Sequence, residues 1–234
     1  MTPPAKRERV WLLDLDNTLH DAVPHVFPRI NRAMTDYVVR RLGLPEAQAS
    51  ELRVHYWRRY GATMLGLIRH HGVDAHEFLR ETHPFPDLHE IVARDHGLRD
   101  ALRRLPGRKI VVTNAPADYA RSVLRRLGIA PMLDGVVSIE SMRFAGRFQP
   151  KPSRPMLRRI VARLRVDAAR CVLVEDSPQN LASARACGLR TVLVTGMAWR
   201  MRDAGRPPRV GVGSRIDLRV HTASRLPRVV GRLK

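Results

Sequence analysis

Several residue types are scarce in this chain, and each scarcity argues against a class of protein. Cysteine occurs only at Cys171 and Cys187, both in apolar segments where a small buried thiol is expected rather than a disulfide or a metal ligand. No apolar run approaches the roughly 18 residues that a transmembrane helix needs. The basic N-terminal residues are not followed by the apolar segment and cleavage site of a signal peptide, so we expect a cytoplasmic protein without a membrane partner.

Acidic residues and lysine are also few. The chain has 22 Asp and Glu against 42 Lys and Arg, which gives a net charge of +20. A nucleic-acid partner would explain this charge. The excess is nearly all arginine, however, and it is scattered over separate predicted helices, which is typical of a coding bias. Aromatic residues make up 5% of the chain, too few for extensive base stacking. We therefore expect no nucleic-acid partner, and we expect the charge to attract small anionic substrates.

The hydrophobic periodicity changes along the chain. Residues 10–14 form a short apolar run typical of a buried strand, and residues 22–105 carry apolar side chains at helical spacing. From residue 108 onward, short β-branched runs alternate with helical segments. Strands are predicted at 109–114, 135–139, 171–175 and 190–195, with helices at 116–127, 153–164 and 177–187. This order predicts an α/β fold, a Rossmann-like parallel sheet with a helical insertion after the first strand.

The predicted domain bounds follow from this pattern. The sheet core covers 8–20 and 106–222 and includes a possible edge strand at 215–220, and the helical insertion covers 21–105. Residues 223–234 are predicted to be an unordered basic tail.

The first strand runs into two carboxylates, Asp14 and Asp16. Acids at the mouth of an apolar strand repel each other and lose solvation, and a bound cation relieves both penalties. Residues two apart share one face of an extended chain, so these acids diverge only if the chain turns after Asp14. Asn17 and Thr18 are turn residues and allow this. An Asp-rich turn without a site remains the alternative.

Other polar residues stand at predicted strand ends, where parallel sheets place their active sites. Thr113 and Asn114 can cradle a phosphate oxygen, although this pair is also common in ordinary turns. Lys151 lies between two prolines, which is either a fixed point charge or a plain rigid loop. Glu175-Asp176 precedes a helix, and Asp176 can equally bind a cation or cap that helix.

Together these motifs resemble the haloacid dehalogenase-like hydrolase superfamily of phosphatases over about residues 9–196. Asp14-Leu-Asp16-Asn-Thr18 matches the first motif, Thr113 the second, Lys151 the third and Glu175-Asp176 the fourth. The helical insertion is similar to the mobile cap of that superfamily.

The resemblance implies a magnesium-dependent phosphomonoesterase. Asp14 would be the nucleophile that forms an aspartyl phosphate, and Asp16 the general acid and then base. Mg²⁺ would be held by Asp14, the Asp16 carbonyl and Asp176, with Glu175 orienting its waters. Thr113, the Asn114 backbone and Lys151 would neutralise the phosphoryl oxygens. Because dehalogenases of the superfamily lack an acid at the position of Asp16, dehalogenation is disfavoured.

A narrower resemblance points to the pyrimidine 5′-nucleotidase branch. It implies nucleoside monophosphates such as UMP and CMP as substrates, and it rests on the segments Asp14–His20, Tyr60–Leu67, His71–Asp74 and Thr113–Ala115. The alternatives are a phosphatase of a sugar phosphate or of phosphoglycolate, or a basic nucleic-acid-binding protein. The oligomeric state stays open.

The predicted cap holds several aromatic and basic side chains. Tyr56 and Tyr60, at helical spacing, are interpreted as packing residues in preference to a contact with a nucleotide base. The cap histidines fit no tetrahedral metal pattern and are interpreted as scattered surface residues. They are His70, His71, His76 and His83.

Overall fold

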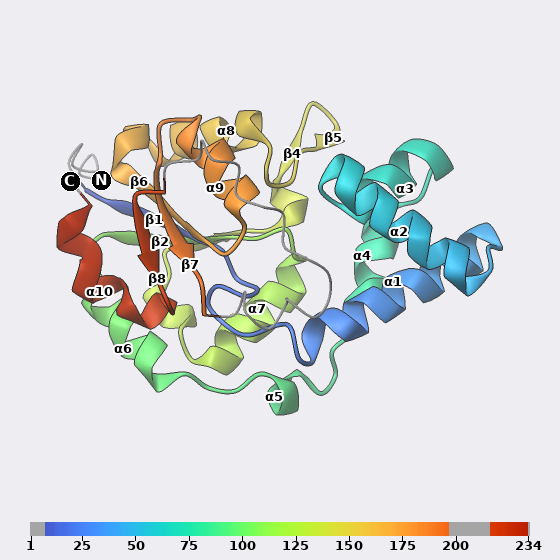
Figure 1. The fold of residues 1–234 in the computed structure, drawn as a ribbon, viewed down its shortest axis with the longest axis horizontal. Helices are drawn as coiled ribbons and strands as arrows, with labels where there is room; N and C mark the ends of the chain where they lie inside the picture. Colours follow the sequence, from blue (N-terminus) through green and yellow to red (C-terminus); the bar gives the residue numbers. More distant parts are fainter. Residues whose placement is uncertain (1–7, 197–215, 234) are drawn as a thin grey trace. The chain divides into compact units, whose positions relative to one another are not determined.

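The computed structural model describes residues 8–196 and 216–233, and the chain divides into two compact units (Figure 1). The sheet unit comprises the described residues up to 23 and from 92 onward, and the helical unit comprises Pro24–Ile91.

A six-stranded parallel sheet is the centre of the sheet unit, in the order β3-β2-β1-β6-β7-β8. The strands are β1 (Val10–Leu13), β2 (Arg108–Val112), β3 (Gly135–Val137), β6 (Cys171–Glu175), β7 (Arg190–Val194) and β8 (Leu218–Val220). All four residues of β1 are buried, as expected for a central strand covered on both faces. The predicted α/β fold with a parallel sheet is confirmed.

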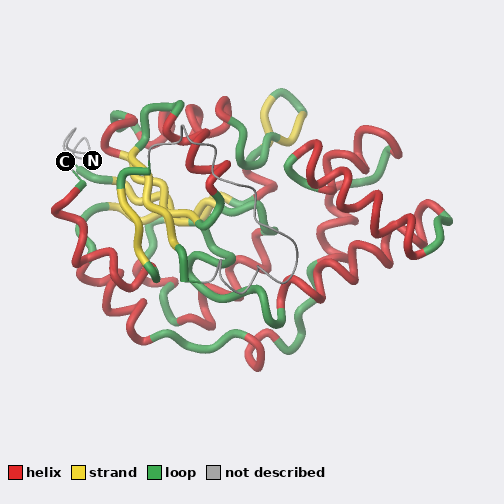
Figure 2. Tube along the Cα trace, in the orientation of Figure 1, coloured by secondary structure: helices red, strands yellow, loops and turns green. Residues whose placement is uncertain are grey.

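Helices lie on both sides of this sheet (Figure 2). One layer contains α8 (Arg154–Leu164) and α9 (Pro178–Arg185), and the other α6 (His96–Arg104) and α7 (Ala117–Leu127). On the first face, Leu12 and Leu173 pack into one apolar cluster with Ile160 and Leu181. The alternation of side chains along β1 sends Trp11 and Leu13 to the opposite face. Because helices cover both faces, the polar residues that follow the strands lie at the carboxyl edge of the sheet.

The helical unit contains α1 (Val26–Leu42), α2 (Glu46–Tyr60), α3 (Thr63–His71), α4 (Ala75–Thr82) and the short α5 (Leu88–Ile91). Tyr37 and Phe78 meet edge to face in its interior, with ring centroids 5.1 Å apart. Gly43 ends α1 in the left-handed conformation, at a φ of 67°. None of the helices in the described ranges is both long and apolar enough to cross a bilayer.

The helical unit is shorter than the predicted insertion of 21–105. Helix α6 belongs to the sheet unit because it contacts the segment after β8, which includes Ala223–Arg225 and α10 (Leu226–Val229). The prediction of an unordered tail over 223–234 is wrong for the described residues 223–233. Leu226 and Leu233 are buried there, so the apolar residues of the segment fold it onto the sheet unit.

A small antiparallel hairpin, β4 (Arg143–Phe144) with β5 (Arg147–Phe148), was not predicted. Its turn residues Ala145 and Gly146 both have positive φ values.

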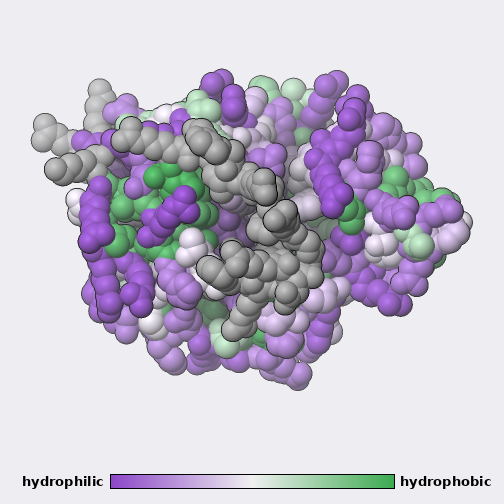
Figure 3. Space-filling model, viewed as in Figure 1, coloured by the Kyte–Doolittle hydropathy of each residue, from purple (hydrophilic) through white to green (hydrophobic). Residues whose placement is uncertain are grey.

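The arginines are dispersed along the chain, as expected, and hydrophilic residues are spread over both units on the face drawn in Figure 3.

Asp217 anchors the edge strand β8. Its carboxylate accepts hydrogen bonds from Arg185 (2.6 Å) and from the Thr191 backbone and hydroxyl (2.8 and 2.9 Å). Burial alone would raise the pKa of Asp217, but the Arg185 and Thr191 donors outweigh it and hold this pKa below its usual value.

We therefore expect Asp217→Ala to lower the free energy of unfolding by about 2–3 kcal/mol at neutral pH, because the buried Thr191 and the half-buried Arg185 lose their acceptor. Urea denaturation measures this loss. A depressed pKa stabilises the fold above the usual Asp range, so the difference from wild type should shrink as the pH falls through the lowered pKa. Asp100→Ala, at an exposed acid, is the matched control and should cost less than about 1 kcal/mol.

Candidate active site

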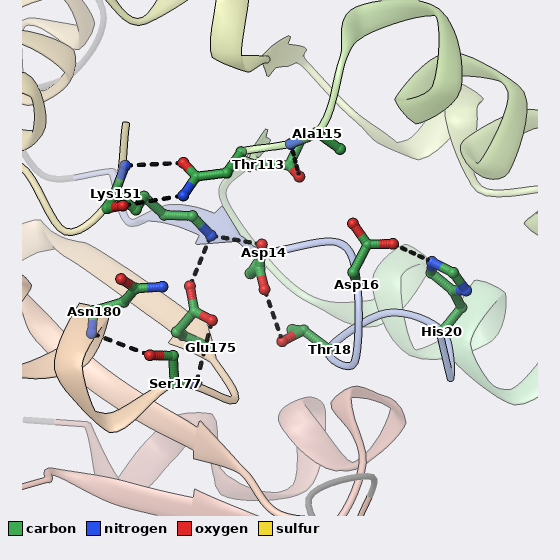
Figure 4. A network of polar contacts seen from close by, with 11 residues as sticks. Asp14, Asp16, Thr18, His20, Thr113, Ala115, Lys151, Glu175, Ser177 and Asn180 are labelled. Carbon is green, nitrogen blue, oxygen red and sulfur yellow. Dashed lines mark hydrogen bonds and ion pairs between the residues drawn. The ribbon is translucent and has the colours of Figure 1, made fainter. Parts of the chain in front are cut away.

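Three charged side chains meet at the carboxyl ends of β1 and β6 (Figure 4). The Lys151 ammonium donates to Asp14 Oδ1 at 2.6 Å and to Glu175 Oε2 at 2.7 Å, and all three residues are buried. The two strands are neighbours and parallel, so residues that follow them emerge side by side. The structure therefore brings together the first, third and fourth sequence motifs.

The side chain of Asn114 holds the lysine loop in place. Its Nδ2 donates to the Lys151 carbonyl at 3.0 Å, and its Oδ1 accepts from the Lys151 backbone N–H at 2.9 Å. Ser153 then caps α8 by accepting from the Met156 N–H. The sequence assigned a role to the Asn114 backbone and missed this side-chain role. Nothing local signals it, because the two segments are 37 residues apart.

Asp14, Glu175 and Asp176 form an acidic cluster, with one carboxylate oxygen of each lying within 4.8 Å of the others. It is the only such group of acids, histidines or cysteines in the described part of the chain. Burial raises the pKa of each acid. The charge of another acid raises each pKa further, and Lys151 opposes the rise for all three. For Asp176, a hydrogen bond with Glu175 also opposes it.

The single positive charge of Lys151 does not balance the three carboxylates, so this buried cluster has excess negative charge when all three are ionised. A divalent cation would balance that charge, and carboxylate oxygens are the ligands that Mg²⁺ prefers, so the residues present fit this ion. The two Glu175 oxygens already accept from Lys151 and from the Ser177 N–H (3.2 Å). Glu175 is thus placed to orient its neighbours, and each of the three acids has a carboxylate oxygen that could hold a cation.

The alternative reading of Asp176 as a helix cap is wrong. Helix α9 begins after Ser177, whose hydroxyl accepts from the Asn180 N–H at 3.5 Å. Because Ser177 is the cap, the helix does not require an acid at Asp176.

Asp16 turns away from Asp14 within two residues. Asn17 adopts a left-handed conformation with a φ of 60°, and the Leu19 N–H closes the turn on the Leu15 carbonyl at 2.9 Å. Thr18 Oγ1 lies 3.4 Å from Asp14 Oδ2 and ties the turn to that carboxylate. The predicted turn after Asp14 is confirmed.

Two residues that the sequence analysis did not assign contact Asp16. His20 Nε2 and the Tyr119 hydroxyl lie 2.8 and 2.7 Å from Asp16 Oδ1. His20 follows Asp16 by four residues across a predicted turn, so the sequence could have indicated this contact. Tyr119 lies on α7, 103 residues from Asp16 in sequence, and only the fold brings it there.

Thr113 follows β2 and is buried. Its hydroxyl oxygen accepts from the Ala115 N–H at 3.0 Å, which fixes the side chain while the hydroxyl keeps its own hydrogen to donate.

Two tyrosines of the helical unit bond to histidines. The Tyr56 hydroxyl lies 2.7 Å from His71 Nε2, and the Tyr60 hydroxyl lies 2.6 Å from His70 Nε2. Tyr56 is buried, in agreement with its interpretation as a packing residue. No histidine joins a metal-type cluster within the described ranges.

An open parallel sheet with a buried carboxylate, a lysine and an acidic cluster at its carboxyl edge is the architecture of an α/β enzyme with its active site at that edge. A family model for haloacid dehalogenase-like hydrolases matches residues 9–188. The chain belongs to this family.

Similar proteins support the assignment. A plasmid-encoded phosphoglycolate phosphatase of Cupriavidus necator is 30% identical over 88% of this chain and 87% of its own length. Phosphate metabolism protein 8 of Saccharomyces cerevisiae is 24% identical over 81% of this chain and 62% of its own. The crystal structure of a HAD phosphatase from Thermococcus onnurineus is 20% identical with a TM-score of 0.59, covering 96% and 98% of the two chains, and at that identity it shows the fold alone.

These comparisons support the family but not the narrower resemblance to pyrimidine 5′-nucleotidases. Phosphoglycolate phosphatases recur among the similar proteins, including one of Pseudomonas putida at 26% identity over 82% of this chain and 71% of its own length. The sequence analysis gave a phosphatase of another small metabolite as an alternative. The similar proteins support this hypothesis better than they support a 5′-nucleotidase.

Proposed function

We propose that this chain is a metal-dependent phosphatase that hydrolyses a phosphate monoester of a small metabolite through an aspartyl phosphate on Asp14. The observation that carries this proposal is the pairing of two unlike carboxylates. Asp14 is buried against Lys151, whereas the Asp16 carboxylate bonds to His20 and Tyr119.

The proposed reaction has two steps. In the first, an Asp14 oxygen bonds to phosphorus while the bond to the leaving oxygen breaks, and Asp16 gives that oxygen a proton. In the second, Asp16 takes a proton from water as the water attacks phosphorus and releases Asp14. Lys151, the Thr113 hydroxyl and the Asn114 backbone N–H would stabilise the charge on the phosphoryl oxygens.

Mg²⁺ is the proposed cofactor, held by the carboxylates of Asp14 and Asp176 and by the Asp16 carbonyl. When bound, it would neutralise the charge of the acidic cluster and of the phosphate. The acidic cluster supports this assignment because Lys151 alone leaves its charge unbalanced.

Asp16 supports phosphate-ester hydrolysis over dehalogenation. An alkoxide is a poor leaving group and needs a proton, whereas a halide leaves without one. An acid beside the nucleophile is useful only in the first case.

Phosphoglycolate is the first candidate substrate because several similar proteins are phosphoglycolate phosphatases. Nucleoside monophosphates are the second candidate, supported by the sequence motifs alone. We propose that the helical unit acts as the cap that selects among such esters.

The test begins with p-nitrophenyl phosphate as a general substrate. We expect turnover that requires Mg²⁺ and stops with a chelator. Asp176→Asn should raise the Mg²⁺ concentration for half-maximal activity on the order of 10- to 100-fold, because a ligand oxygen is lost. Asp167→Asn, at an exposed acid, is the control and should leave that concentration unchanged. Phosphoglycolate, sugar phosphates, UMP and CMP should then be compared by kcat/KM, and an absence of metal-dependent turnover on every ester contradicts the proposal.

A further inference from the structure

Two hydrogen-bonding groups converge on one oxygen of Asp16. The Tyr119 hydroxyl donates to Oδ1 at 2.7 Å, and His20 Nε2 lies 2.8 Å from the same atom. Both residues are almost fully buried, with exposed fractions of 4% for Tyr119 and 6% for His20. They come from different elements, since His20 follows the turn after β1 and Tyr119 lies in the first turn of α7.

The chemistry of the two partners makes both of them donors. A tyrosine hydroxyl that lies beside a carboxylate oxygen donates its hydrogen to that oxygen. His20 Nε2 faces the same oxygen, which calls for the tautomer with hydrogen on Nε2. His20 Nδ1 is buried with no hydrogen-bond partner among the described residues, so the ring is bonded only through Nε2.

We propose that Tyr119 and His20 are positioning residues that orient Asp16 and keep Oδ1 as an acceptor. An oxygen that already accepts two hydrogen bonds is a poor site for a proton, so the proton that Asp16 transfers is carried by Oδ2. This inference rests on the proposed function and adds the residues that make Asp16 an effective acid.

The step that they support is the cleavage of the ester. The bond from Asp14 to phosphorus forms, the bond from phosphorus to the leaving oxygen breaks, and the proton moves from Asp16 Oδ2 to that oxygen. A rotated Asp16 would present the wrong oxygen, and the alkoxide would have to leave unprotonated. The requirement vanishes when the leaving group is a stable anion such as 2,4-dinitrophenolate.

Leaving-group dependence therefore separates positioning from mere packing. We would measure kcat/KM, which reports steps up to the first irreversible one, on an alkyl ester (β-glycerophosphate) and on 2,4-dinitrophenyl phosphate. Tyr119→Phe and His20→Leu should lower kcat/KM on the alkyl ester by about 10- to 100-fold. This is less than the roughly 10²- to 10⁴-fold that general acid catalysis contributes, because Asp16 itself remains in both variants. On 2,4-dinitrophenyl phosphate we expect a change of less than about 3-fold, because that leaving group needs no acid.

Three further variants sharpen the test. His20→Gln places an amide N–H near the position of Nε2 and should recover most of the activity on the alkyl ester. Asp16→Asn removes the acid itself. It therefore gives the largest difference between the kcat/KM losses on the two esters that loss of acid catalysis can cause. Tyr37→Phe makes the same change at a buried tyrosine of the helical unit and should leave the ratio of the two kcat/KM values unchanged.

Equal losses on both esters in Tyr119→Phe and His20→Leu, without recovery in His20→Gln, would mean that the two residues only maintain the fold, and the proposal is then overturned. A wild-type protein inactive on both esters would instead overturn the proposed function. The two failures are therefore distinguishable.

Discussion

Replacing Asp14 with asparagine is expected to lower kcat by about 10⁴-fold or more while leaving the protein folded, because an amide of the same shape is a poor nucleophile. The substitution keeps the volume and one acceptor oxygen beside Lys151 and Thr18. Hydrolysis of p-nitrophenyl phosphate in Mg²⁺ measures the loss, and circular dichroism checks the fold.

The same variant should be more stable than wild type when metal is removed. Burial, and then the charge of Glu175, raises the pKa of Asp14 well above its usual value, in spite of Lys151. The unfolded chain ionises this group at the usual value, so wild-type stability falls as the pH rises from there through the raised pKa. Asparagine lacks this dependence, and its Tm advantage should grow across the same pH window.

A thermal melt in chelator, repeated from acidic to neutral pH, tests this sign. Asp167→Asn, at an exposed position, should show no such trend. A Tm for Asp14→Asn below that of wild type at neutral pH would contradict the assignment of Asp14 as a buried, costly carboxylate. The destabilisation by a buried Asp14 carboxylate is the kind of stability cost expected at a functional site.

The sheet could be predicted from the sequence because buried parallel strands have a local signature. Cys171–Glu175 is a continuous apolar run that ends in an acid, and its predicted bounds match β6. The convergence of Asp14 and Glu175 also followed from sequence, since carboxyl ends of parallel strands share one edge. These inferences needed only the order of strands and helices.

The remaining features depend on tertiary contacts that no local pattern encodes. Tyr119 reaches Asp16 only because α7 packs beside the end of β1, and Asn114 reaches the Lys151 backbone only across two loops. The segment after β8 looked like a basic tail because its arginines dominate the composition. Its few apolar residues, Leu226 and Leu233 among them, are nevertheless enough to pack it onto the sheet unit.

Replacing Lys151 with methionine should abolish turnover and destabilise the metal-free protein by about 3–5 kcal/mol at neutral pH, because a buried ion pair loses one partner. Lys151 is the cation that bonds to Asp14 and Glu175, at 2.6 and 2.7 Å. Burial would lower the pKa of Lys151, but the two acids outweigh it and raise that pKa. The lysine therefore stabilises the fold below its usual titration range, as long as the two acids are ionised.

A double-mutant comparison isolates the cause of that loss. If the loss comes from uncompensated carboxylates, Glu175→Gln in the Lys151→Met background should restore a large part of the stability, although Glu175→Gln alone should not stabilise wild type to the same degree. Acidification should narrow the gap between Lys151→Met and wild type, because the orphaned acids then take up protons. Lys109→Met, at a lysine whose ammonium donates to the Gly107 carbonyl, is the matched control and should cost about 1 kcal/mol. Equal losses at the two lysines would show that the Lys151 charge is not what holds the acidic site together.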